Sequence, residues 1–350
     1  MLRKRIPLRG RVERFRLESR VLRGNPLGDP HVREVAVYLP PEYEREPDRR
    51  FPVFVDLVGF LGSGPAHLNW RAFDENVPER LERLVRRGEM GPVIAVFPDC
   101  WTRLGGNQYI NSPAVGRYAD YLVREVLPAV DERYRTFGDA RHRAVFGKSS
   151  GGYGAIVHGM RYARHWGAIA CHSGDMYFEF CYGHDIPRTL DSLAAYGGDP
   201  ARFLRAFYGK KKLSRGDAHT IMFLAMAAFY DPDPDAPLGF RLPMDTHTGE
   251  IDRRRWARWQ RHDPIRLVDR EACRRQLRSL SGIYIDCGRR DQYYMHYGAR
   301  ILHRKLRQYG IPHRYEEFDD DHSGIDYRLD VSLPWLYRRI MGGRRGRARA

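Results

Sequence analysis

Short apolar segments alternate with longer amphipathic ones along most of the chain. The apolar segments are bounded by Pro or Gly and have the length of buried strands; they cover 51–59, 92–97, 144–146, 168–171, 282–287 and 315–318. Between them, apolar residues recur with helical spacing at 75–87, 114–134, 153–164, 298–309 and 325–340. Strands that alternate with helices predict the α/β class, with a mainly parallel sheet and helices on both of its faces.

Two regions depart from this alternation. Residues 12–22 and 31–39 alternate apolar and polar positions, which predicts two antiparallel strands joined by the turn-rich RGNPLGDP. Between 175 and 281 the strand pattern gives way to helical stretches, Pro-rich turns and many aromatic residues. Because the strand pattern resumes afterwards, we interpret 175–281 as a helical cap inserted into a single domain that spans 1–341.

The composition is that of a soluble globular protein. A chain of 350 residues with 42% hydrophobic residues can bury a large core, and the mean hydropathy of -0.60 argues against a membrane span. The basic start MLRKRIPLRG lacks the apolar stretch of a secretory signal. The five cysteines have no C-x-x-C spacing, so we expect buried, reduced thiols, a cytoplasmic location and no membrane partner.

The net charge of +16 invites a nucleic-acid hypothesis, because a clustered basic surface attracts phosphate. Nearly all of this charge is arginine, however, and it is spread over the chain among Asp and Glu residues with no recognition motif. We therefore expect no nucleic-acid partner. The last residues, 342–350, lack apolar positions and are predicted to form a disordered basic tail.

The stretch AVFGKSSGGYG at 144–154 fits two motifs. A P-loop would need a glycine five residues before Gly147, but that position is His142. The pattern G-x-S-x-G fits Gly147, Ser149 and Gly151, with a strand before it and a helix directly after. It predicts that Ser149 is a nucleophile on a sharp turn at a helix N-terminus, whose dipole favours developing negative charge. The alternative is an ordinary glycine-rich connection.

A nucleophilic serine needs a histidine base, and that histidine needs a carboxylate to orient it. In this arrangement the acid and then the histidine follow the serine along the chain. Asp291 lies in the loop after the strand 282–287, whereas Asp286 lies inside that strand and is the weaker candidate. His322 follows the last strand in the loop DDDHSGID, which a metal-binding or merely solvated turn would also explain. No second motif supports a metal.

The same chemistry needs two backbone donors for an oxyanion. The amide of Ser150 follows the nucleophile, and the loop VGFLGSG offers the amide of Phe60 or Leu61. Aromatic and polar residues near strand ends are candidates for the substrate pocket, although packing explains each of them equally well; they are Trp101, Tyr109, Asn111, Tyr177 and Phe178.

From about 33 to 335 the chain resembles the esterase D-like family of α/β-hydrolases, which includes S-formylglutathione hydrolases, enterochelin esterase-like enzymes, feruloyl esterases and mycolyltransferases. The block GKSSGGYGA is the most specific part, and REVAVYLPPEYE, CGRRDQYY and DDDHSG add to it. The resemblance implies an α/β-hydrolase fold with Ser149 as nucleophile, Asp291 as acid and His322 as base. Gly324 stands where the family commonly has an aromatic residue, so the adjoining pocket wall differs.

These observations predict a serine carboxylic-ester hydrolase that acts on a small-molecule ester through an acyl-enzyme and needs no cofactor. An acyltransferase would use the same groups but exclude water. A non-catalytic binding protein on the same scaffold is the rival from another class, and an arginine-based polyanion binder is the third. The sequence leaves the particular ester and the oligomeric state open.

Overall fold

A computed structural model describes residues 8–342, so the tail predicted to be disordered lies outside the described residues from 343 onward. The described part contains one large sheet with the strand order β1-β2-β4-β3-β7-β8-β9-β10. Its strands are β1 (Arg11–Glu18), β2 (Val32–Leu39), β3 (Val53–Leu57), β4 (Ile94–Pro98), β7 (Arg143–Lys148), β8 (Ala168–His172), β9 (Gly282–Gly288) and β10 (Arg314–Phe318). Only the β1/β2 and β2/β4 pairs among them are antiparallel. The prediction of a mainly parallel sheet is confirmed.

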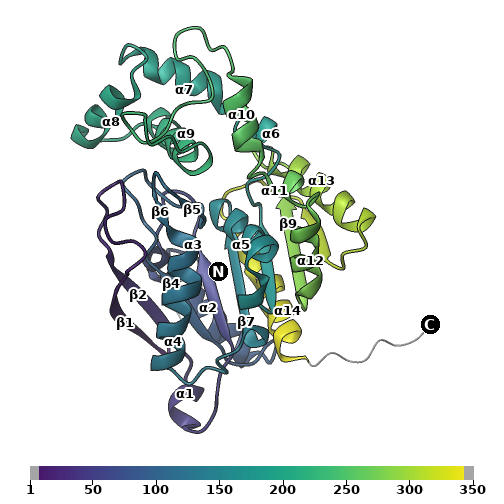
Figure 1. Cartoon of the computed structure of the whole chain (residues 1–350). Coiled ribbons are helices and arrows are strands. Elements are labelled where there is room, and N and C mark those ends of the chain that lie inside the picture. The colour runs from purple at the N-terminus through teal and green to yellow at the C-terminus, as the bar shows by residue number, and fades with distance from the viewer. Residues whose placement is uncertain (1–7, 343–350) are drawn as a thin grey trace.

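Helices cover both faces of this sheet (Figure 1). Side chains alternate along β4, so that Ile94 and Val96 enter the core on one face while Ala95 and Phe97 enter the core on the other. The second core is closed by α2 (Val77–Arg86) and α14 (Leu329–Met341). The first is closed by α4 (Leu127–Arg133), α5 (Ser150–Arg161), α12 (Glu271–Ser279) and α13 (Met295–Gln308).

The helix predicted at 114–134 begins later than expected. A two-stranded hairpin of β5 (Asn111–Ser112) and β6 (Gly116–Arg117) occupies its first residues, and Gly116 there has a φ of 143°, which only glycine adopts readily. The helical run then consists of α3 (Tyr118–Asp120), a π-helical stretch η2 (Tyr121–Val126) and α4. The remaining short elements are α1 (Glu42–Arg45), η1 (Gly64–Leu68), η3 (Ala140–His142), η4 (Ala163–His165) and η5 (Ile325–Arg328).

The region between β8 and β9 is helical throughout its regular part, as its pattern predicted. Its helices are α6 (Phe178–Cys181), α7 (Asp185–Ala194), α8 (Pro200–Gly209), α9 (Arg215–Tyr230), α10 (Arg253–Gln260), α11 (Pro264–Leu267) and α12. Figure 1 shows α7 to α10 as a layer above one end of the sheet, whereas α12 lies beside α5. Gln276 of α12 accepts a hydrogen bond from the Ala163 amide at 3.0 Å, directly after α5. The layer above the sheet is therefore shorter than 175–281.

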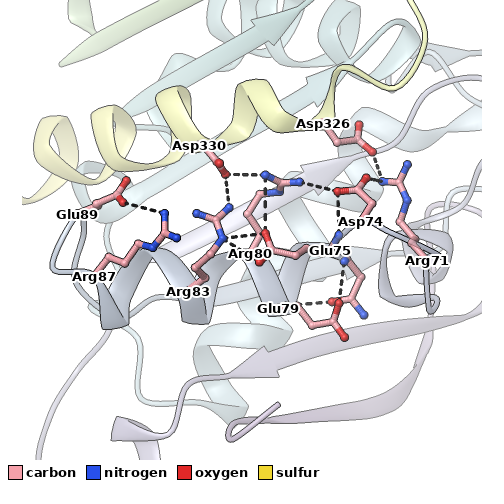
Figure 2. A network of polar contacts seen from close by, with 11 residues as sticks. Arg71, Asp74, Glu75, Glu79, Arg80, Arg83, Arg87, Glu89, Asp326 and Asp330 are labelled. Atoms are coloured by element: carbon pink, nitrogen blue, oxygen red, sulfur yellow. Dashed lines mark hydrogen bonds and ion pairs between the residues drawn. The ribbon is translucent and has the colours of Figure 1, made fainter. Parts of the chain in front are cut away.

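Part of the arginine content is used inside the fold. Figure 2 shows a network that joins α2 to α14 and to the loop before α2. The Arg80 side chain is only 3% exposed and lies 2.5 Å from Asp330 Oδ1 and 3.2 Å from Asp74 Oδ1. Arg83 of the same helix contacts Asp330 at 2.6 Å, and Arg71 pairs with Asp326. Since a buried charge that loses its partner is strongly destabilising, these pairs fix the two helices against each other.

The five cysteines are buried and free, as the sequence predicted. Among the described residues, no helix combines the length and the apolar character needed to cross a membrane.

Candidate active site

The parallel strands bring distant parts of the chain together at one edge of the sheet. The carboxyl ends of β3, β7, β8, β9 and β10 point the same way, so the loops that follow them meet there. A cavity of about 780 Å³ lies at this edge, and Phe60, Ser149, Asp175 and His322 each line it. These four residues come from the loops after β3, β7, β8 and β10 respectively.

Ser149 occupies a strained turn between β7 and α5. Its φ of 58° and ψ of -125° are uncommon for a residue with a side chain, and α5 begins at the next residue. A Cβ on Gly151 would lie 1.8 Å from the carbonyl oxygen of Leu57, and one on Gly147 would lie 2.3 Å from the same atom. Both glycines are therefore required by the close approach of β3. Because β7 turns directly into α5, no loop remains here that could surround a phosphate.

His322 is held by a buried carboxylate. Its Nδ1 lies 2.7 Å from Asp291 Oδ2, and Asp291 is only 2% exposed. Burial raises the pKa of Asp291, but the hydrogen bond and charge of His322, together with backbone hydrogen bonds from Tyr293 and Met295, bring the pKa below its usual value. The His322 amide also donates to Gln292 Oε1 at 2.9 Å. With Nδ1 directed at Asp291, the other ring nitrogen, Nε2, is the one available to the cavity.

Asp286, the alternative carboxylate, is occupied elsewhere. Its Oδ1 lies 2.6 Å from His172 Nδ1, and its Oδ2 accepts a hydrogen bond from Arg328 Nε at 2.9 Å. His172 in turn lies 2.9 Å from Ser332 Oγ through its Nε2. These contacts connect β8, β9 and α14 within the fold, which is a structural function rather than a catalytic one.

The aspartates before His322 shape its loop. Asp321 Oδ1 accepts a hydrogen bond from the Ser323 amide at 2.6 Å, and Asp320 Oδ1 accepts one from the Asp321 amide at 2.9 Å. Asp319 pairs with Arg290 at 2.5 Å. Nowhere in the part of the chain that the structure describes do three or more His, Cys, Asp or Glu side chains gather as they would around a metal ion.

Two backbone amides near Ser149 are the candidates for binding an oxyanion. Ser150 is the first residue of α5, where amides have no acceptor inside the helix. In the loop after β3, the Leu61 amide already donates to the Gly105 carbonyl at 2.9 Å, which leaves Phe60 as the candidate of the two. This loop lies against the serine turn, since a Cβ on Gly59 would be 3.4 Å from the Cβ of Ser149.

None of the side chains that the sequence offered for the substrate pocket lines this cavity. Tyr109 is buried and donates from its hydroxyl to the Val58 carbonyl at 2.6 Å, which supports the loop of Phe60 from behind. Phe178 is fully buried, with its ring centroid 4.9 Å from that of Tyr230. Both side chains pack against neighbouring residues, as an aromatic residue beside an apolar segment usually does.

The other three candidates also lie away from the cavity lining. Tyr177 stacks on Phe180 with a centroid distance of 4.5 Å. Asn111 accepts a hydrogen bond from the Asp120 amide at 3.1 Å, and Trp101 is 41% exposed.

The cavity is instead lined by residues that the sequence did not single out. From the helical region these include Tyr182, Arg188, Arg215, His219 and Met222, and from the loop after β9 they include Gln292 and Tyr293. Gln292 and Tyr293 follow Asp291 directly, so their place next to the predicted acid was a signal that could have been used. Nothing in the helical pattern of α7 and α9 indicated which face would meet the cavity.

Asp175 anchors a buried polar cluster beside the serine turn. Its Oδ2 accepts hydrogen bonds from Tyr182 Oη at 2.7 Å and from Ser150 Oγ at 3.2 Å, and Gln108 Nε2 donates to Ser150 Oγ at 2.7 Å. Burial raises the pKa of Asp175. This cluster fixes the side chain of Ser150, the first residue of α5.

The sheet order, the serine turn and the loop positions define the α/β-hydrolase fold. The family model described as "Putative esterase" matches residues 30–332, and the chain belongs to this family. An esterase of Mycobacterium tuberculosis is 33% identical over 146 residues, which are 40% of this chain and 28% of that protein. The chain thus matches less than a third of the length of this curated relative.

Solved structures share the fold across nearly the whole chain. A ferulic acid esterase superposes with a TM-score of 0.61 and 21% identity, covering 95% of this chain and all of the other. An S-formylglutathione hydrolase from Agrobacterium tumefaciens gives a TM-score of 0.57 at 15% identity, covering 96% of this chain and 98% of its own. A fluorophosphonate-binding serine hydrolase of Staphylococcus aureus gives 0.57 at 13% identity, covering 94% and 98%.

Proposed function

We propose that the protein is a serine carboxylic-ester hydrolase with Ser149 as nucleophile, His322 as base and Asp291 as the acid that orients the base. The observation that carries this proposal is that the serine turn and the His322–Asp291 pair lie at the same cavity. The strained turn of Ser149 and the 2.7 Å contact between His322 and Asp291 arise from separate loops, and Ser149 and His322 line the same space. Membership of the esterase family supports the same chemistry.

The reaction follows from these positions. Ser149 Oγ bonds to the carbonyl carbon of the ester while His322 Nε2 takes its proton, and the amides of Ser150 and Phe60 stabilise the oxyanion. The bond from carbon to the alcohol oxygen then breaks, and His322 passes the proton to that alcohol. Water adds to the acyl-enzyme in the same way, giving the acid and restoring the proton to Ser149. Throughout, Asp291 stabilises the imidazolium form of His322.

Acyl transfer to another alcohol would use the same first half of the cycle. The cavity lining includes Arg188, whose side chain is 60% exposed, so the cavity opens to solvent at this side chain. We infer that water is the acyl acceptor, and membership of the esterase family supports hydrolysis. We propose further that α7 to α10 act as a cap that restricts which small-molecule esters or thioesters reach Ser149; feruloyl esters and S-formylglutathione, which the names of the structural neighbours mention, mark the range of such substrates.

A series of p-nitrophenyl esters from acetate to palmitate tests this proposal with the wild type, Ser149→Ala and the exposed control Ser279→Ala. We expect Ser149→Ala to lower kcat/KM by roughly 10³-fold or more, because the residual rate comes only from binding and the oxyanion donors. Ser279→Ala should keep wild-type activity. A fluorophosphonate probe should label Ser149 and no other serine in the wild type. Absence of both hydrolysis and labelling would overturn the proposal in favour of a non-catalytic binding protein.

A further inference from the structure

The outer wall of the cavity carries two arginines and a histidine. Arg188 comes from α7, and Arg215 and His219 come from α9; all three line the cavity, and we call them the cationic wall. Lys148 lines the cavity from the side of the sheet. Asp175 is the single carboxylate among the lining residues of the described chain, and its pKa is raised by burial. Among the lining side chains, guanidinium and ammonium groups therefore outnumber carboxylates.

A buried aspartate lies behind part of the cationic wall. Asp185 of α7 has a fully buried side chain, and its Oδ1 lies 3.3 Å from His219 Nδ1 and 3.5 Å from Arg188 Nη1. Arg215 precedes His219 by four residues in α9, so the two side chains leave the same face of that helix. The contact between α7 and α9 therefore brings both arginines to one side of the cavity.

Arg215 is left without an internal partner. Within residues 8–342, no hydrogen bond or ion pair holds its guanidinium, in contrast to the arginines of the α2 network. Gly216 and Ala218, from the first turn of the same helix, also line the cavity. The N-terminus of α9 itself is capped by Ser214 and by the Asp217 carboxylate, so the positive charge on this side of the cavity comes from the side chains.

The cationic wall lies close to the reacting groups. The Tyr293 ring is 4.9 Å from the His322 ring and 6.1 Å from the His219 ring, measured between centroids. One tyrosine ring therefore separates the proposed catalytic base from the wall. A group held by the wall and an ester carbonyl placed at Ser149 can belong to one small molecule.

We propose that the cationic wall binds a carboxylate or phosphate group of the substrate, so that the protein selects anionic esters. This inference rests on the proposed function, because it names the class of ester that Ser149 cleaves. Guanidinium groups bind both kinds of anion through paired hydrogen bonds, and Arg215 is free to do so. Arg188 contacts Asp185 only through Nη1 at 3.5 Å and is 60% exposed, so its guanidinium keeps donors available to an anion.

The test compares p-nitrophenyl glutarate, which carries a free carboxylate, with the neutral p-nitrophenyl pentanoate of similar length. A phosphate-bearing p-nitrophenyl ester forms a third arm, which distinguishes phosphate from carboxylate. The ratio of kcat/KM between anionic and neutral esters is measured for the wild type, for Arg188→Gln/Arg215→Gln and for Arg205→Gln. Arg205 is an exposed arginine of α8 outside the cavity lining, so it controls for the loss of cap charge alone.

We expect the wild type to prefer one of the anionic esters, and the double variant to lower that ratio by about tenfold or more, mainly through KM. Arg205→Gln should leave the ratio unchanged. A wild type that prefers the neutral ester, or a double variant with an unchanged ratio, would overturn the inference while Ser149 labelling leaves the proposed function intact. If no ester is cleaved but Ser149 is labelled, the test instead measures whether glutarate or phosphate slows labelling of Ser149 by the fluorophosphonate probe. Slower labelling of the wild type that is lost in the double variant would support the inference. Labelling that neither anion slows, or that both proteins show equally slowed, would overturn it.

Discussion

His322 pairs with Asp291 and not with Asp286. Asp291 Oδ2 lies 2.7 Å from His322 Nδ1, while Asp286, five residues earlier, contacts His172 and Arg328 instead. Both carboxylates are almost fully buried. The difference arises because Asp286 lies within β9 and points into the fold, whereas Asp291 lies in the loop beyond the strand end.

The two aspartates give a matched pair of variants. Asp291→Asn should lower kcat by roughly 10³- to 10⁴-fold with little change in folding, because an amide no longer holds the required tautomer of His322. Asp286→Asn should instead lower the free energy of unfolding by about 3 kcal/mol or more, since it leaves buried charge uncompensated. Kinetics on a p-nitrophenyl ester and urea denaturation of both variants make the comparison. Equal losses of kcat in the two folded variants would contradict the assignment of Asp291.

The serine turn predicts a steric requirement at Gly151. A Cβ there would lie 1.8 Å from the Leu57 carbonyl oxygen, and backbone must shift to relieve that contact. We expect Gly151→Ala to lower the free energy of unfolding by about 3 kcal/mol, the upper part of the range for overpacked sites, and to abolish labelling of Ser149. Gly209→Ala is the control, because no atom lies within 4 Å of its added Cβ. A Gly151→Ala protein with wild-type stability would show that the turn is not as tight as described.

His67 predicts a dependence of stability on pH. Burial lowers its pKa, but the charge and hydrogen bond of Asp56, 2.6 Å away, outweigh this and raise the pKa above the ordinary value. For a histidine with a raised pKa, the added stability is fully present below the unfolded pKa of about 6.5 and is lost as pH rises through the folded pKa. This interaction holds η1, which follows the loop of Phe60.

Urea denaturation between pH 6 and pH 9 checks this expectation with the wild type and His67→Gln. The destabilisation by His67→Gln should be larger at pH 6 than at pH 9. His247→Gln, at an exposed position, serves as the control and should show no such trend. A destabilisation by His67→Gln that stays constant across this range would show that the charge of His67 does not contribute.

The sequence by itself determined the sheet, the helices that cover it and the candidate catalytic groups. Strand and helix periodicities are local, so β3, β4, β7, β8, β9 and β10 lie within a few residues of their predicted positions. The spacing of Gly147, Ser149 and Gly151 reflects a local turn, and Asp291 and His322 directly follow strand ends. For these residues, position along the chain also determines position at the sheet edge.

Only the tertiary structure decided which residues form the walls of the cavity. Tyr109 and Phe178 had the right residue type but pack in the core, whereas Arg188 and Arg215 meet the cavity because α7 and α9 pack against each other. The orientation of a helix about its axis depends on contacts with residues far away in the chain. The periodicity of a single helix reveals that it has a buried face, but not which partner that face or its opposite will meet.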